Sequence, residues 1–301
     1  MSLRRAQKPS NLNMQKIRTY GPVLEWCWAS DNRLFNAISK PFWLSCFVID
    51  GLMIDSGAPA SVTALKSFIQ SLGAGDAVDR CVLTHWHEDH SGGARMLAGE
   101  LHLPVYASPV TIEKISAGFT YPFYRQWAWG KGVAPTSGVI PLPSSAISTR
   151  SGNFSFDIVA MPGHADGLLC LVEMSRGWAF TSDALMPRYG MLFGHTSDIH
   201  ENIEAIYRSI RNLLDATERI KGAMTLFISG HGGFAEGRTL LLKTLEELEK
   251  MHGRAHDLKS RGLSDRQIRG VMFHRESLSG IITRGELSKL NLVRSLLQWP
   301  K

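Results

Sequence analysis

Short apolar runs separated by turn residues dominate the first two thirds of the chain. Two such runs, 44–49 and 52–54, flank Asp50-Gly51, the strongest two-residue turn signal, so residues 44–55 predict a β-hairpin. Residues 61–72 predict a helix that Gly73 ends. Further strands are predicted at 80–84, 103–107, 154–160, 168–174, 178–181 and 225–229, the last strand of the chain.

The pattern becomes helical toward the end of the chain. Residues 198–214 carry a one-sided apolar stripe, and from about residue 236 only helical periodicity remains. The tetrapeptides 264–267 and 283–286 both fit the capping box that begins a helix. We therefore place a boundary near residue 236, where a domain of mixed strands and helices (21–235), preceded by an N-terminal extension (1–20), meets a C-terminal region of three or more helices (236–301).

The order of these elements also predicts a fold class. Two blocks of strands, each followed by helices, lack the regular alternation of strand and helix that marks a doubly wound sheet. Because a sheet must bury a face against another layer, this order predicts an α+β protein of stacked sheets with outer helices.

Composition changes this picture little. Hydrophobic residues make up 44% and charged residues 20%, as in an ordinary globular protein, and the net charge of +6 is a mild basic excess that hints at anionic partners. The four cysteines show no C-x-x-C spacing and mostly lie in apolar runs, which predicts reduced core residues. No signal peptide or membrane span is visible, so we expect a cytoplasmic protein.

Candidate chemistry is concentrated directly after the strand predicted at 80–84. Residues 84–90, Thr-His-Trp-His-Glu-Asp-His, place four metal-ligand types within six residues: His85, His87, Asp89 and His90. Neutral imidazoles and ionised carboxylates are ligands that zinc prefers. His85 and His87, at i and i+2, point to one side of an extended chain, and the next two ligands reach a second centre once the chain turns. We expect Gly92 and Gly93 to give the backbone the freedom for that turn.

The order His-x-His-x-Asp-His resembles the defining motif of the metallo-β-lactamase superfamily. Residues 54–57 are similar to the strand-end turn I-D-T-G of that family, and residues 161–167 are similar to its P-G-H-T-x-G motif. Residues 180–183 and 229–233 resemble its G-D and P-G-H-G motifs, with serine replacing the glycine and the proline. The resemblance covers about residues 20–235 and implies a four-layer αββα sandwich, here with a C-terminal helical extension.

The resemblance also implies a set of metal ligands. One ion would be held by His85, His87 and His164, and the other by Asp89, His90 and His231. Asp183 would bridge both ions, as in glyoxalase-II-like members, and Asp55 would orient the first motif through hydrogen bonds. We expect two divalent ions, zinc before iron or manganese, which lower the pKa of a shared water. Asp89 would then orient the resulting hydroxide as the catalytic carboxylate.

Several activities of the superfamily can be ranked on these residues. An aspartate at position 183 disfavours a β-lactamase, and His87 disfavours a flavodiiron oxidoreductase. The leading prediction is hydrolysis of an ester, thioester or lactone by a hydroxide that bridges two metal ions. The alternatives are a phosphodiesterase or ribonuclease, which the positive charge favours, a mono-iron persulfide dioxygenase, and a metal-stabilised binding protein without turnover.

Residues outside the motifs are candidates for substrate contacts. The aromatic run 119–129, which includes Tyr124 and Trp127, either borders the site as an apolar wall or forms a separate core cluster. Tyr189 and His195 follow Asp183 closely and are predicted to approach the substrate. We expect a small-molecule substrate and no membrane. Nucleic acid is the less favoured partner, and the C-terminal helices suit a lid, a homodimer interface or a nucleic-acid surface.

Overall fold

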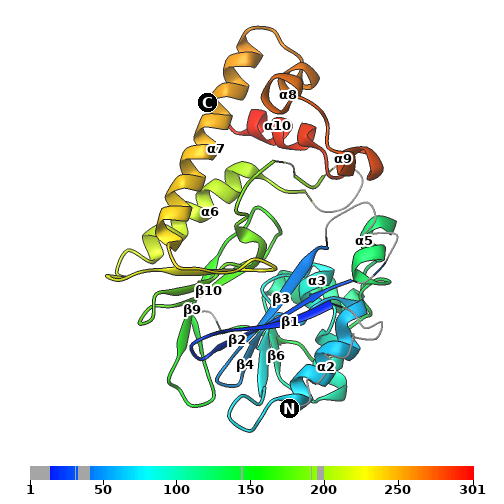
Figure 1. The fold of residues 1–301 in the computed structure, drawn as a ribbon, viewed down its shortest axis with the longest axis vertical. Helices are drawn as coiled ribbons and strands as arrows, with labels where there is room; N and C mark the ends of the chain where they lie inside the picture. Colours follow the sequence, from blue (N-terminus) through cyan, green and yellow to red (C-terminus); the bar gives the residue numbers. More distant parts are fainter. Residues whose placement is uncertain (1–13, 31, 33–40, 144, 191, 195–199) are drawn as a thin grey trace, which may run out of the picture.

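The computed structural model describes residues 14–30, 32, 41–143, 145–190, 192–194 and 200–301. His195 and residues 198–199 of the predicted helix therefore lie outside the described residues. Within those ranges the strands form two sheets, of seven and six strands, with helices on their outer faces (Figure 1).

The first sheet runs in sequence order from β1 to β7. Its first four strands pair antiparallel, and β4 to β7 pair parallel. The strands are β1 (Met14–Tyr20), β2 (Val23–Ala29), β3 (Trp43–Ile49), β4 (Leu52–Ile54), β5 (Arg80–Val82), β6 (Val105–Ala107) and β7 (Ile140–Pro141).

The second sheet has the order β13-β12-β11-β10-β9-β8. All its neighbours pair antiparallel except β11 and β12, which are parallel. The strands are β8 (Ala146–Ser148), β9 (Ser155–Ala160), β10 (Leu169–Glu173), β11 (Trp178–Phe180), β12 (Thr225–Ile228) and β13 (Gly232–Phe234).

Helices fill the connections. Four short ones, including a single-turn π-helix at Met96–Glu100, lie next to the strand ends: η1 (Pro59–Ser61), α3 (Glu88–Ser91), η2 (Met96–Glu100) and η3 (Ser182–Ala184). The others are α2 (Val62–Ser71), α4 (Pro109–Ala117), α5 (Phe123–Trp129), α6 (Ile203–Ala216), α7 (Gly237–Ser260), α8 (Asp265–Phe273), α9 (Leu278–Ile282) and α10 (Lys289–Gln298).

Three hydrophobic cores separate four layers. Successive strand residues point to opposite faces, so on β3 Cys46 and Val48 pack under α2 and its neighbours while Phe47 packs between the sheets. On β10, Leu171 reaches the same inner core, and Cys170 and Val172 face the opposite way, toward α6 and α7. The layers are therefore helix, sheet, sheet, helix, which confirms the predicted α+β sandwich with a C-terminal helical extension.

Most of the predicted elements are confirmed. The hairpin forms with Asp50-Gly51 at its turn, the helix at 61–72 is α2, and the later strands lie within one or two residues of their expected ends. All four cysteines are buried and none forms a disulfide. No helix among the described residues is long and apolar enough to cross a membrane.

Four details differ from the predictions. The predicted extension contains β1, which pairs with β2 along its full length. The helix expected from 198 begins at Ile203, where the Asn202 side chain accepts a hydrogen bond from Ala205 N. β12 is not the last strand, because the glycine-rich β13 follows and has no apolar pattern to reveal it. The prediction of a second capping box is also wrong, because α9 has already ended where Thr283 lies and Ser288 caps α10 instead.

The C-terminal region consists of four helices, α7 to α10, at one end of the molecule beside α6 (Figure 1). The Ser264 capping box begins α8 as predicted. Buried Leu241, Ile268 and Leu292 of these helices belong to the same core as Ile206 of α6. The helices are therefore joined to the second sheet by a continuous apolar interior.

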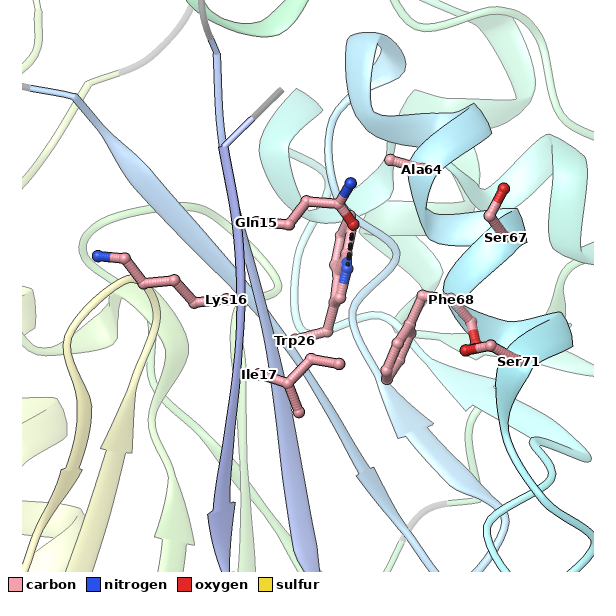
Figure 2. A pocket seen from close by; sticks show the side chains of 8 residues that line it. All are labelled: Gln15, Lys16, Ile17, Trp26, Ala64, Ser67, Phe68 and Ser71. Carbon is pink, nitrogen blue, oxygen red and sulfur yellow. Dashed lines mark hydrogen bonds between the residues drawn. The ribbon is translucent and has the colours of Figure 1, made fainter. Parts of the chain in front are cut away.

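A shallow groove of about 440 Å³ lies between β1 and α2 (Figure 2). Trp26 and Phe68 stack in its floor with ring centroids 5.9 Å apart, and Gln15 accepts a hydrogen bond from the Trp26 indole. None of the residues that line it is a predicted site residue. The groove is therefore separate from the candidate chemistry.

Candidate metal centre

Three segments, each following a strand, bring the predicted ligands together. Residues 84–90 follow β5 of the first sheet, and Asp183 lies in η3 after β11 of the second. His164 lies in the turn between β9 and β10. The candidate site thus lies where strand ends of both sheets meet, which neither sheet could provide alone.

The ligand atoms form two groups, and within each group all atoms lie within 4.8 Å of one another. The first consists of His85, His87 and His164, the three histidines predicted for one ion. The second contains His85 and His90 with Asp183. Asp183 Oδ2 lies 3.4 Å from His90 Nε2 and 3.8 Å from His164 Nε2, so this carboxylate lies between the two groups.

The donor atoms of this cluster fit metal ions. His85 Nε2, His87 Nε2, His90 Nε2 and Asp89 Oδ1 are buried without a hydrogen-bond partner in the described structure. A buried polar atom without a partner costs about 1–3 kcal/mol. Four of them in one place, all of ligand types that zinc accepts, are what a metal centre requires.

The other two predicted ligands, Asp89 and His231, belong to neither group. Asp89 Oδ2 lies 3.7 Å from His90 Nε2, beside the second group. His231 follows β12 in the turn to β13, and its side chain is exposed. Among the described residues it belongs to neither of the two groups, although its charge still contributes to lowering the pKa of Asp183.

Burial and charge divide the histidines into two kinds. Burial, with the neighbouring rings and Arg125, holds the pKa of His85 and His87 well below the ordinary 6.5, so both are neutral, as ligands must be. Burial also lowers the pKa of His90, but three nearby carboxylates, led by Asp183, outweigh it and raise that pKa well above 6.5. The same carboxylates would attract a cation in place of the proton.

Asp55 has the contacts of an orienting carboxylate. It is almost completely buried at the end of β4 with a positive φ of 63°. Its carboxylate accepts hydrogen bonds from Thr84 N at 2.7 Å and Thr84 Oγ1 at 2.8 Å, and lies 2.8 Å from His90 Nδ1. It therefore connects the start of the histidine motif to one of its ligands and leaves His90 Nε2 toward the cluster.

Ser182, which stands where the resembled motif has glycine, joins this network. Its φ of 49° is one that glycine adopts more easily. Its hydroxyl lies 2.9 Å from Thr84 Oγ1 and 3.2 Å from His90 Nδ1. The hydroxyl thus gives the serine polar contacts that a glycine would lack.

Two carboxylates beside the ligands were not found from the sequence. Glu201 lies 2.7 Å from His164 Nδ1 and also accepts a hydrogen bond from Phe193 N. Glu88, completely buried between two ligands in the motif, forms a bidentate ion pair with Arg125 of α5. The only sequence signal was the position of Glu88 inside the motif, and neither partner is near in sequence.

The two glycines after the motif act differently from the prediction. Gly92 has an ordinary helical φ of −61°, and neither glycine has a positive φ. A Cβ on Gly92 would lie 2.3 Å from Pro59 Cδ, and one on Gly93 would lie 2.3 Å from Ser56 O. The prediction of backbone freedom is therefore wrong, and the glycines instead allow α3 to pack closely against the turn at 56–59.

The candidate substrate residues are separated by the structure. Tyr124 is buried on α5, and its hydroxyl has no partner in the described structure, whereas Trp127 is 39% exposed on the same helix. Tyr189 is buried, and its hydroxyl donates to Ala184 O in its own loop. The aromatic run thus contributes both to the core and to the surface.

Comparisons with known proteins agree with this geometry. The sequence profile of the Metallo-beta-lactamase superfamily matches residues 45–251. An uncharacterized protein from Aquifex aeolicus is 25% identical over 184 residues, which cover 55% of this chain and 79% of that protein. Hydroxyacylglutathione hydrolase GloC from Haemophilus influenzae is 27% identical over 157 residues, which cover 51% of this chain and 68% of the relative.

Solved structures share the fold at low identity. A metallo-beta-lactamase family protein from Thermus thermophilus aligns with a TM-score of 0.60 and 18% identity, covering 85% of this chain and 88% of that one. A metallo-beta-lactamase from Pontibacter korlensis aligns with a TM-score of 0.58 and 16% identity, covering 77% and 98%. Because the family profile spans more than half of the sequence and the fold and histidine cluster agree with it, this chain belongs to the metallo-beta-lactamase superfamily.

Proposed function

We propose that the protein is a metal-dependent hydrolase that cleaves an ester, thioester or lactone. The observation that carries the proposal is the buried cluster of imidazole and carboxylate atoms without partners, with Asp183 between its two groups. The relative named as a hydroxyacylglutathione hydrolase supports a thioester within this class. The buried, unpaired cysteines are compatible with a reducing cytoplasm.

The proposed ligands are those predicted from the sequence. His85, His87 and His164 would hold one ion, and Asp89, His90 and His231 the other, with Asp183 shared between them. Two divalent ions, zinc first, would acidify a water and polarise the scissile bond. His231 is exposed, and its place in the second set rests on the resemblance alone.

The residues of the chain supply orientation and proton handling. Asp89 presents a buried Oδ1 without a partner, an acceptor that can hold the attacking water and receive its proton. Asp55 keeps His90 in one ring orientation, and Glu201 does the same for His164. Burial raises the pKa of Asp183, but His90 and His164 outweigh it and lower the pKa to about 2, so the carboxylate stays ionised.

The proposal is tested by metal analysis and a panel of four substrates. Purified protein should contain two divalent ions per chain. It should hydrolyse p-nitrophenyl acetate, a homoserine lactone or S-lactoylglutathione faster than bis-p-nitrophenyl phosphate. A preference for the phosphodiester would favour the nuclease alternative, and one iron per chain without hydrolysis would favour the dioxygenase. Asp183→Asn should lose both activity and metal, because an amide is a poor bridging ligand.

A further inference from the structure

Two described stretches, 192–194 after Asp183 and 200–203 leading into α6, are both held by α10. In the first stretch, Leu192 O accepts a hydrogen bond from Asn291 Nδ2 at 3.2 Å, and Leu192 also pairs with Ser288. In the second stretch, Ile203 N donates to Ser295 Oγ at 2.9 Å. Asn291 and Ser295 are four residues apart, so they lie on the same face of α10.

Both attachments are buried. Leu192 and Ile203 have at most 1% of their surface exposed, and Asn291 and Ser295 have less than a tenth. A hydrogen bond lost in such a place leaves a polar backbone group without water to replace its partner. Both stretches therefore depend on side chains of α10.

The stretch 200–203 carries Glu201, whose carboxylate is 5% exposed. One oxygen lies 2.7 Å from His164 Nδ1, and the other accepts from Phe193 N of the first stretch at 2.6 Å. The next residue, Asn202, donates its backbone N–H to Gly163 O at 2.7 Å, directly beside the histidine. The Glu201 carboxylate thus contacts the backbone of the first stretch and the His164 ring at the same time.

The hydrogen bond with Glu201 has a specific effect on His164. A carboxylate can only accept, so His164 Nδ1 carries the proton. In the neutral ring, Nε2 then keeps its lone pair and faces His87 and Asp183, as a ligand atom must. A displaced Glu201 would free the ring to rotate or to change tautomer.

We propose that α10 positions Glu201, and through it His164, so that the C-terminal helices form a supporting part of the metal centre. The inference rests on the metal centre of the proposed function but does not depend on its substrate. Glu201, Asn291 and Ser295 are positioning residues, since none of them belongs to the two ligand groups. Partners of metal-bound histidines typically contribute a factor of about 10–100 in metal affinity.

The test measures zinc affinity of the full-length protein by competition with a chromophoric chelator, without substrate. Glu201→Gln should weaken zinc binding about 10–100-fold at the site that contains His164. The amide has a single oxygen and cannot accept from both Phe193 N and His164 Nδ1. Asn291→Ala with Ser295→Ala should weaken zinc binding in the same direction. Arg294→Ala removes an exposed side chain from the same helix, so that variant should bind like the wild type.

A double-mutant cycle separates positioning from general stability. If α10 acts through Glu201, the α10 substitutions should weaken zinc binding much less in the Glu201→Gln protein than in the wild type. Equal effects in both backgrounds would overturn the proposal. The proposal would also be overturned if the folded Asn291→Ala/Ser295→Ala protein bound zinc within twofold of the wild-type affinity, even if that protein melted at a lower temperature.

A second measurement needs no metal. Nitrogen-15 NMR of the histidine rings in metal-free protein should show His164 protonated at Nδ1 in the wild type and a changed ring signal in the α10 double variant. A neutral His164 ring that carries its proton on Nε2 and not on Nδ1 in the wild type would refute the role of Glu201. Tight zinc binding and the expected tautomer without hydrolysis of any substrate in the panel would instead refute only the hydrolase proposal.

Discussion

The ion pair of Glu88 and Arg125 allows a quantitative prediction about the metal motif. Both side chains are buried, with 0% and 6% exposure, and the guanidinium contacts the carboxylate through two nitrogens. Glu88 lies between His87 and Asp89, so the pair links the ligand motif to α5. Arg125 also lies over the Phe193 ring, 5.0 Å from its centroid, next to the segment that carries Glu201.

Arg125→Met should be strongly destabilising because it leaves the Glu88 carboxylate buried without its partner. Breaking a buried pair in this way costs about 3–5 kcal/mol. With an unfolding entropy of about 2.1 cal/mol/K per residue, each kcal/mol corresponds to roughly 1.6 °C for a chain of 301 residues, so the melting temperature should fall by roughly 5–8 °C. Replacing both partners by apolar residues, Glu88→Leu with Arg125→Met, should recover much of the loss, because no buried charge is then left unpaired.

The assay is urea unfolding of the two single variants, the double variant and the wild type, all metal-free. An exposed pair, Lys66 with Glu100, provides the control, and Glu100→Gln should hardly change the midpoint. The reasoning is refuted if Arg125→Met costs less than about 1 kcal/mol, or if the double variant loses the sum of the single losses.

Three further predictions concern the backbone and titrating groups. Gly163→Ala should lower the free energy of unfolding in urea by about 1–3 kcal/mol. The φ of Gly163 is +134°, and a Cβ there would lie 2.5 Å from Ile206 N. Gly222→Ala is the control and should be neutral, because a Cβ at Gly222 meets open space. Burial raises the pKa of Cys27 to about 11. The contribution of this thiol to stability is therefore complete below its ordinary pKa of 9.0 and is lost as the pH rises through 11. Iodoacetamide at pH 8 should modify Cys27 roughly 100-fold more slowly in the native protein than in denatured protein. Partial burial raises the pKa of Glu276, but hydrogen bonds from Ser288 Oγ and two backbone amides outweigh burial and lower that pKa. Glu276→Gln should therefore destabilise the protein at pH 7 and much less at pH 4.

Each of these has a clear contrary result. Equal unfolding midpoints for the alanine variants at 163 and 222 would show that α6 can move away from the turn. Rapid alkylation of the native thiol would show that Cys27 is accessible. A Glu276→Gln penalty that grows as the pH falls would contradict a depressed pKa, since the stabilisation from such a group is present above its ordinary 4.5 and is lost as the pH falls through its lower folded value.

The ligand motif and the layered fold could be predicted because their signals are local. The apolar runs 44–49 and 52–54 on either side of Asp50-Gly51 predict a hairpin whatever it packs against. The ligands from His85 to His90 lie within six residues at the end of a strand, so their convergence needs little long-range information. Position-by-position resemblance then supplied His164 and Asp183, and the structure places both beside the first motif.

The glycines and caps show where local patterns have more than one outcome. Gly92 was expected to provide a turn, but its role is to let α3 approach Pro59, a contact between segments more than thirty residues apart. Thr283 fits a capping box, yet the chain there is leaving α9 through Arg284 and Gly285, both at positive φ. A side-chain pattern cannot tell a helix start from a helix end when tertiary contacts determine the path.

Local sequence patterns specify which atoms are available for metal chemistry and the order of strands and helices that brings them near. The side chains that support those atoms come together only in the folded chain. Glu201 is 37 residues from His164, and Arg125 is 37 residues from Glu88. Asn291 is 99 residues from Leu192, the residue whose carbonyl it holds. Such pairs leave no periodic trace, because a single buried carboxylate or amide is chosen by the partner it meets after folding rather than by its neighbours in the chain.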